Sequence, residues 1–297
     1  MRVLNICHSD YANASHDNAR ALRFIGVECD DFVMSPHPFG YLSQSELINR
    51  HYLPYIVDSY DVVQIFHSCP VSLEYVLMGG PKKLVVYHTG SRYRNEPERF
   101  NNLFNPNVTV SFSDHCEFEK LGAKNYKYIA PFVDMSPVKK ADSKLIVGHF
   151  PSNPEVKGTK EIKQMIKPFE PFFEFRISEE QIPHEQNIKR IAECHIYIEL
   201  FKPELNGKPY GHYGVTAFEA TSLGCKVITQ NLNNHVYEKE YGPTPFLLAN
   251  TPEDFARILD DIKYWHRTAF EPNKEFYERH SIESTGKRSE EHTSELQ

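Results

Sequence analysis

Several features that would define a common protein class are missing from this 297-residue sequence. No run approaches the roughly 18 apolar residues that a membrane-spanning helix needs, so we expect no membrane span. The first residues, 1–6, turn polar too quickly for a signal peptide. The formal net charge is −7, which argues against nucleic acid as a partner. Together these absences predict a cytoplasmic protein.

Cysteine is scarce, and the common short motifs are absent. The six cysteines show no CxxC pairing, so we expect free, buried thiols in a reducing compartment and no metal site. The chain has no GxGxxG, no phosphate-binding P-loop, no HExxH and no GxSxG. Those motifs mark dinucleotide-binding, NTPase, zinc-protease and serine-hydrolase sites. None of these four classes is therefore predicted.

What the sequence does contain is a regular alternation of short apolar runs and helical patterns. Alternation of this kind is typical of parallel βαβ units. A segment rich in proline and polar residues, 131–143, divides the pattern in two and reads as a linker. We predict an α/β protein with two Rossmann-like parallel-sheet domains, 1–135 and 136–287. The predicted strands are 3–6, 62–66, 84–87 and 108–112 in the first domain, and 145–148, 172–177, 196–200 and 227–229 in the second.

The last ten residues, 288–297, differ from the rest of the chain. They match the translation of a common sequencing adapter, and we interpret them as a non-native tail. On this interpretation the natural chain continues past Lys287.

In the first half, polar residues follow the predicted strands, where ligands bind in parallel sheets. Three strands end in histidine followed by serine or threonine. Since these ends meet at one edge, we expect a shared polar site there. The alternative is that each histidine only caps backbone groups. The candidate residues are His8, Asp10, His67, His88, Gly90, Ser91 and Arg92.

In the second half, two segments have the features of a phosphate and ribose site. Lys157-Gly158 stands at a helix start after a strand, preceded by Ser152 and Asn153. Further on, Tyr213-Gly214 opens a helix that carries Glu219. Helix N-termini attract anions, and a carboxylate can accept hydrogen bonds from a ribose diol. The alternatives are a surface lysine and an ordinary helix–strand connection.

These segments resemble those of GT-B glycosyltransferases, especially the family-4 type. The resemblance implies that Lys157 neutralises the donor diphosphate, that Gly214 lies in the donor loop and that Glu219 binds the ribose. It also implies that His88 and Gly90-Ser91 border the sugar and acceptor pocket. The chain departs from the family pattern at four places. Thr89 is inserted after His88, residues 11–15 replace a Gly-Gly loop, and no arginine stands shortly before Lys157. Gly211 stands where a first glutamate is expected, and Glu199 and Glu204 are the candidate substitutes.

The resemblance implies two domains facing across a cleft and transfer of a sugar from a nucleotide-sugar donor to an unknown glycan, lipid-linked or small-molecule acceptor. It implies retention of anomeric configuration, with no metal and no cofactor. We assign catalytic roles to His88 and Asp10, and acceptor-side contacts to His8, His67, Gly90, Ser91 and Arg92. Donor contacts are assigned to Ser152, Asn153, Lys157, Gly158, Tyr213, Gly214 and Glu219. A nucleotide-sugar epimerase or hydrolase, and a non-catalytic sugar- or nucleotide-binding module, are the alternatives.

Overall fold

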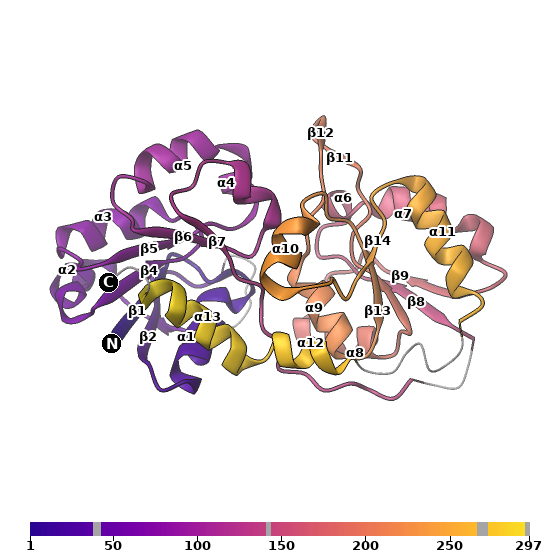
Figure 1. Cartoon of the computed structure of the whole chain (residues 1–297), viewed down its shortest axis with the longest axis horizontal. Helices are drawn as coiled ribbons and strands as arrows, with labels where there is room; N and C mark the ends of the chain where they lie inside the picture. Colours follow the sequence, from indigo (N-terminus) through magenta and orange to yellow (C-terminus); the bar gives the residue numbers. More distant parts are fainter. Residues whose placement is uncertain (38–42, 141–143, 266–272, 295–297) are drawn as a thin grey trace. The chain divides into compact units, whose positions relative to one another are not determined.

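The computed structural model describes residues 1–37, 43–140, 144–265 and 273–294. It divides the chain into two compact units, which we describe separately (Figure 1). The first unit comprises Met1–Phe132 with His280–Gln297, and the second comprises Val133–Arg279. Three residues of the predicted linker, 141–143, lie outside the described part of the chain.

A parallel seven-stranded sheet forms the centre of the first unit, in the order β3-β2-β1-β4-β5-β6-β7. The four strands predicted here are present, the last one displaced by two residues at its start. The other three were not predicted, because they are short or interrupted by charged residues. The strands are β1 (Arg2–Cys7), β2 (Glu28–Val33), β3 (Glu46–Leu47), β4 (Val62–Ile65), β5 (Leu84–Tyr87), β6 (Val110–Ser113) and β7 (Tyr126–Tyr128).

Alternate residues of this sheet supply two separate cores. Leu4, Val63 and Val86 pack on one face with the aromatic residues of the helices there, whereas Val3, Val62 and Val85 pack on the other with α1. Burial on both faces explains why these strands read as continuous apolar runs. The helices of the unit are α1 (Ala14–Phe24), α2 (Leu53–Ile56), α3 (Pro70–Met78), α4 (Gly90–Asn95), α5 (Pro97–Phe104) and α13 (Ile282–Ser294).

The second unit has a parallel five-stranded sheet in the order β14-β13-β10-β8-β9. Its strands are β8 (Ile146–His149), β9 (Glu174–Ile177), β10 (Ile196–Ile198), β13 (Lys226–Thr229) and β14 (Leu247–Leu248), and a small hairpin pairs β11 (Glu204–Leu205) with β12 (Lys208–Pro209). The helices are α6 (Pro154–Lys157), α7 (Thr159–Met165), α8 (His184–Ala192), α9 (Val215–Ser222), α10 (Asn234–Tyr241), α11 (Pro252–Ile262) and α12 (Lys274–Arg279).

Local signals in the sequence account for several boundaries in this unit. Thr251 forms a capping box with Asp254 at the start of α11, and Pro252 occupies the first turn. The apolar face of α11 then packs on β8, β10 and β13 through Phe255 and Leu259. The prediction of an α/β fold with two parallel sheets is confirmed. Among the described residues, no helix is both long and apolar enough to cross a bilayer.

The C-terminal helix α13 belongs to the first unit, where it packs along α1 (Figure 1). A Cβ added to Gly286 would lie 2.2 Å from the carbonyl oxygen of Ala21, so glycine permits this close approach. Asn18 donates a hydrogen bond to the buried Ser289 Oγ at 3.1 Å. Residues 280–287, predicted in the second domain, therefore pack with the first unit. The predicted tail, 288–297, begins inside α13, and its last three residues lie outside the described part.

Candidate functional site

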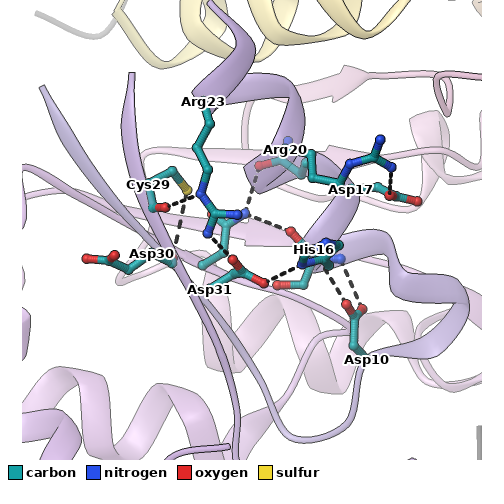
Figure 2. A network of polar contacts seen from close by, with 11 residues as sticks. Asp10, His16, Asp17, Arg20, Arg23, Cys29, Asp30 and Asp31 are labelled. Atoms are coloured by element: carbon teal, nitrogen blue, oxygen red, sulfur yellow. Dashed lines mark hydrogen bonds and ion pairs between the residues drawn. The ribbon is translucent and has the colours of Figure 1, made fainter. Parts of the chain in front are cut away.

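Three of the polar residues that follow strands of the first unit, Asp10, His67 and Thr89, meet at the carboxyl edge of its sheet. Asp10 follows β1 and is almost wholly buried. One of its carboxylate oxygens accepts the backbone N–H of Ser15 at 3.0 Å, and the other accepts that of His16 at 3.0 Å (Figure 2). These N–H groups lie in the first turn of α1 and have no acceptor within the helix, and a carboxylate is favourable there. The side chain of Asp10 is thus fixed in orientation.

Side chains from both ends of α1 take part in a second polar network, also drawn in Figure 2. His16 Nδ1 lies 2.8 Å from Asp31 Oδ2, and Arg23 forms an ion pair with the other oxygen of the same carboxylate. Arg23 Nε also donates to the carbonyl oxygen of Cys29 at 2.7 Å. Hydrogen bonds from His16 and Arg23 outweigh burial and lower the pKa of Asp31. The network anchors α1 to β2, and with it the position of Asp10.

His67 lies beside Asp10 at the end of β4. Its Nε2 is 3.1 Å from Asp10 Oδ1 and 3.1 Å from the backbone N of Tyr11, while its Nδ1 is 2.7 Å from Thr89 Oγ1. The backbone φ of His67 is 59° and that of Ser68 is 49°. Residues other than glycine seldom adopt such values, and they often do so at functional sites.

The predicted catalytic residue His88 occupies a different environment. It is wholly buried, it stacks on the ring of Tyr93 at 4.0 Å, and its Nδ1 lies 2.8 Å from Ser68 Oγ. Burial lowers the pKa of His88 to about 3, so the imidazole is neutral. His88 has no exposed surface, and the Ser68 hydroxyl group that it contacts is equally buried. Its predicted contact with a sugar stays a prediction.

The remaining candidates of the first unit differ in exposure. His8, Ser91 and Arg92 are exposed, and Gly90 adopts a φ of +68° with open space around its missing side chain. His37 belongs to the same edge but was not assigned from the sequence, because it follows a strand that was not predicted. Its ring contacts that of Tyr11 edge-on at 5.3 Å.

In the second unit, Lys157 forms an ion pair with Glu199, which follows β10. The Glu199 side chain is 1% exposed and that of Lys157 is 18% exposed. Thr229 Oγ1 donates to the second oxygen of Glu199 at 2.8 Å. A Cβ added to Gly214 would lie 2.3 Å from Glu199 Oε1 and 2.7 Å from Lys157 Nζ. Glycine at 214 therefore lets the ion pair lie against the start of α9.

Gly158 and His149 hold the loop that carries Lys157. Gly158 has a φ of +73°, and an added Cβ would lie 1.9 Å from the carbonyl oxygen of Phe201, so no other residue fits. His149 is buried between the carbonyl oxygen of Ile198, at 2.7 Å, and Thr159 Oγ1, at 2.8 Å. Burial lowers the pKa of His149 to about 4. Both contacts join the start of α7 to β10.

Gly214 is the N-cap of α9, so no side-chain hydrogen bond caps the helix, and its first turn has no acidic residue. Glu219, further along α9, is 15% exposed, and its Oε1 lies 2.7 Å from Nε2 of His184. His184 begins α8 and is 59% exposed. It was not assigned from the sequence, where nothing distinguishes it from other polar residues near proline.

The other predicted donor residues are less suited to direct contact. Tyr213 is buried among aromatic rings, and its hydroxyl group bonds Asn234 and Thr244. It therefore supports the loop from within. Asn153 caps α6 by accepting the N–H of Val156 at 3.2 Å, and Ser152 is exposed.

Comparison with known proteins gives similarity in structure but none in sequence. No protein-family model and no curated protein matches the chain. The structure of trehalose-6-phosphate synthase OtsA is 7% identical with a TM-score of 0.62, covering 100% of this chain and 99% of that one. AviGT4, a glycosyltransferase involved in Avilamycin A biosynthesis, is 10% identical with a TM-score of 0.57, covering 100% and 98%.

A third similar structure is UGT89C1 of Arabidopsis thaliana complexed with UDP, 9% identical with a TM-score of 0.50 and 99% coverage of both chains. At these identities the likeness concerns the fold. The chain has two α/β units, each with a parallel sheet, and it matches glycosyltransferases of this architecture over its full length. It therefore has the GT-B fold.

Proposed function

We propose that the protein transfers a sugar from a nucleotide-sugar donor to an acceptor. The proposal is carried by one arrangement in the second unit. The Lys157 ammonium group lies against Gly214, the N-cap of α9, where no side chain caps the helix, and Glu219 lies further along α9. An ammonium group and free backbone N–H groups are suited to a diphosphate, and a carboxylate is suited to a ribose diol.

In this proposal Lys157 stabilises the negative charge that grows on the diphosphate as the bond to the sugar breaks. Gly214 leaves room for the Lys157 ammonium group beside the first N–H groups of α9. Glu219 binds the ribose hydroxyl groups and exchanges its contact with His184 for them. Gly158 keeps Lys157 in place. Ser152 and Asn153 border the donor at the exposed end of α6, and Tyr213 supports the loop.

The first unit would supply contacts to the acceptor, a glycan, a lipid-linked sugar or a small molecule. Exposed His8, Ser91 and Arg92, with Gly90, are the groups proposed for these contacts. Asp10 and His67 lie at the same edge of the sheet. Independence of a metal and retention of configuration belong to the proposal through the family resemblance alone.

A non-catalytic binding module is the second candidate, and one observation favours it. Glu199 already neutralises Lys157, which leaves less net positive charge for a diphosphate. In addition, the position where the family pattern has a first glutamate is Gly211, and an added Cβ there would lie 2.9 Å from Gln230 Cγ. A glutamate at position 211 would therefore require the Gln230 side chain to move.

Nucleotide-sugars screened by thermal shift, followed by nucleotide release with and without candidate acceptors, test the proposal. Acceptor-dependent release supports a transferase, and an epimerised sugar supports an epimerase. Release without an acceptor supports a hydrolase, and binding without turnover supports a module. Glu219→Gln should weaken donor binding, whereas the exposed Lys160→Met, on α7, should not. Equal binding by wild type and Glu219→Gln would remove the assignment of the ribose.

A further inference from the structure

Three residues from three loops at the carboxyl edge of the first unit form a continuous polar chain. Asp10 follows β1, His67 follows β4 and Thr89 follows β5. The imidazole of His67 lies between the other two, with Nε2 at 3.1 Å from Asp10 Oδ1 and Nδ1 at 2.7 Å from Thr89 Oγ1. A carboxylate, an imidazole and a hydroxyl group in this order can move a proton from the hydroxyl group to the imidazole.

The contacts of Asp10 decide which nitrogen of His67 carries the proton. Two groups compete for Nε2, both at 3.1 Å: the Asp10 carboxylate can accept a proton from it, whereas the backbone N–H of Tyr11 can donate to it. A hydrogen bond to an ionised group is about twice as strong as one between neutral groups. The Asp10 contact therefore favours a proton on Nε2. Nδ1 is then an acceptor directed at the hydroxyl group of Thr89.

The buried pair behind this chain serves as an internal comparison. Ser68 and His88, the neighbours of His67 and Thr89, form the same kind of contact at 2.8 Å, but both are wholly buried. That pair has no route to a ligand. Thr89 is only partly buried, caps α4 without a side-chain hydrogen bond, and precedes Gly90, beside which there is open space. The hydroxyl group of Thr89 is thus the outer end of the chain.

We propose that Thr89 and His67 accept the proton of an acceptor hydroxyl group, with Asp10 as the positioning residue; this rests on the proposed glycosyl transfer. The acceptor O–H gives its proton to Thr89 Oγ1, and Thr89 gives its own to His67 Nδ1. The acceptor oxygen forms a bond to the anomeric carbon of the donor. The bond from that carbon to the diphosphate breaks, and the nucleoside diphosphate leaves with the electron pair.

This relay specifies the acceptor as an alcohol or a sugar hydroxyl group. A base that activates the acceptor also makes a direct displacement available, which inverts the anomeric carbon. The relay and the family resemblance therefore predict opposite anomers. The anomer of the first product, read by proton NMR before mutarotation, distinguishes them.

The first test uses the unliganded protein and does not depend on the donor. Nitrogen-15 NMR of the histidine side chains, with His67 assigned by its loss in His67→Gln, reports which nitrogen carries the proton at neutral pH. A proton on Nε2, and a shift of Nδ1 in Thr89→Val, are expected. A proton on Nδ1 would overturn the relay.

The second test measures turnover with the donor and acceptor found for the wild type. His67→Gln should lower kcat by about 10²- to 10⁴-fold, the usual range for a lost general base, with KM for the donor nearly unchanged. Thr89→Val should lose a comparable factor, and Thr89→Ser should restore most of it. His51→Gln, an exposed histidine at η2 (Arg50–Tyr52), is the matched control. Full activity of Thr89→Val would overturn the relay.

A pH profile separates the relay from a purely structural role. The rate should fall on acidification, since a protonated Nδ1 cannot accept a proton, and Thr89→Val should flatten this limb. The titratable groups that face His67 are Asp10, His37, Asp114 and Cys7. Asp10→Asn, which keeps a capping oxygen for α1, should also lower kcat. If the wild type turns over no donor, the proposed function fails, and the NMR measurement decides the relay by itself.

Discussion

Replacement of Lys157 by methionine is expected to destabilise the second unit far more than replacement of an ordinary surface lysine. The change leaves the Glu199 carboxylate, whose side chain is 1% exposed, with the hydrogen bond from the Thr229 hydroxyl group and without its cationic partner. Removing one partner of a buried ion pair typically costs about 3–5 kcal/mol, because the other charge stays buried and uncompensated. We expect a loss near the lower end, about 3 kcal/mol, since Lys157 is itself partly exposed.

A double-mutant cycle of Lys157→Met with Glu199→Gln identifies the origin of this loss of stability. Glu199→Gln should cost about 1 kcal/mol, because the freed ammonium group of Lys157 can turn to solvent. In the double variant the methionine no longer faces a buried charge. The double variant should therefore be more stable than Lys157→Met alone, with a coupling energy of about 1–3 kcal/mol.

Urea unfolding followed by tryptophan fluorescence measures this prediction in the relevant unit. Trp265 is the single tryptophan of the chain and packs on the core of the second unit. Lys160→Met, an exposed lysine on α7, is the control and should change the free energy of unfolding by less than about 0.5 kcal/mol. A loss below about 1 kcal/mol in Lys157→Met, or additive effects in the cycle, would refute the buried ion pair.

Three further predictions follow from named contacts. Gly214→Ala should weaken donor binding about as much as Lys157→Met does, because the new Cβ displaces the ammonium group; unchanged binding in titration calorimetry would contradict this. The folded-state pKa of His149, about 4, lies below the unfolded value near 6.5, so its stabilising contribution is complete above pH 6.5 and is lost as pH falls toward 4, by up to about 3 kcal/mol. His149→Gln should flatten that part of the stability–pH curve measured by urea unfolding. Deletion of 288–297 should lower the free energy of unfolding of the first unit by more than about 1 kcal/mol, since it removes Ser289 from Asn18; an unchanged value would support a non-native tail.

The sequence predicted the elements whose signal is local. Continuous apolar strands such as β4 and β5 were predicted within one residue of their observed bounds. Short strands that carry charges, such as β2 with its sequence Glu-Cys-Asp-Asp-Phe-Val, were missed. Their acidic side chains pair with Arg2 and Arg23, contacts that only the folded chain brings together.

In the second unit, the candidate site was predicted in its residues but not in its pairings. Lys157 and Glu199 are 42 positions apart, and Glu199 was considered only as a substitute for a missing glutamate. Periodicity cannot predict that these two side chains form a buried ion pair against Gly214. Likewise, Tyr213 reads as a loop residue from the sequence, whereas its ring is held in a cluster with Phe246 and Tyr237.

The histidines of the first unit show most clearly why sequence alone cannot assign roles at a sheet edge. β4 and β5 are each followed, within one residue, by histidine and a hydroxyl residue in the same order, which suggests equivalent functions. The left-handed backbone at His67 and Ser68 makes the pairing crossed: His67 meets Thr89, and Ser68 meets His88. One imidazole is consequently placed beside Asp10 and the other deep against Tyr93. Since a strand pattern does not encode that turn, the sequence favours His88 only through the family resemblance, whereas our proposal gives the role of base to His67.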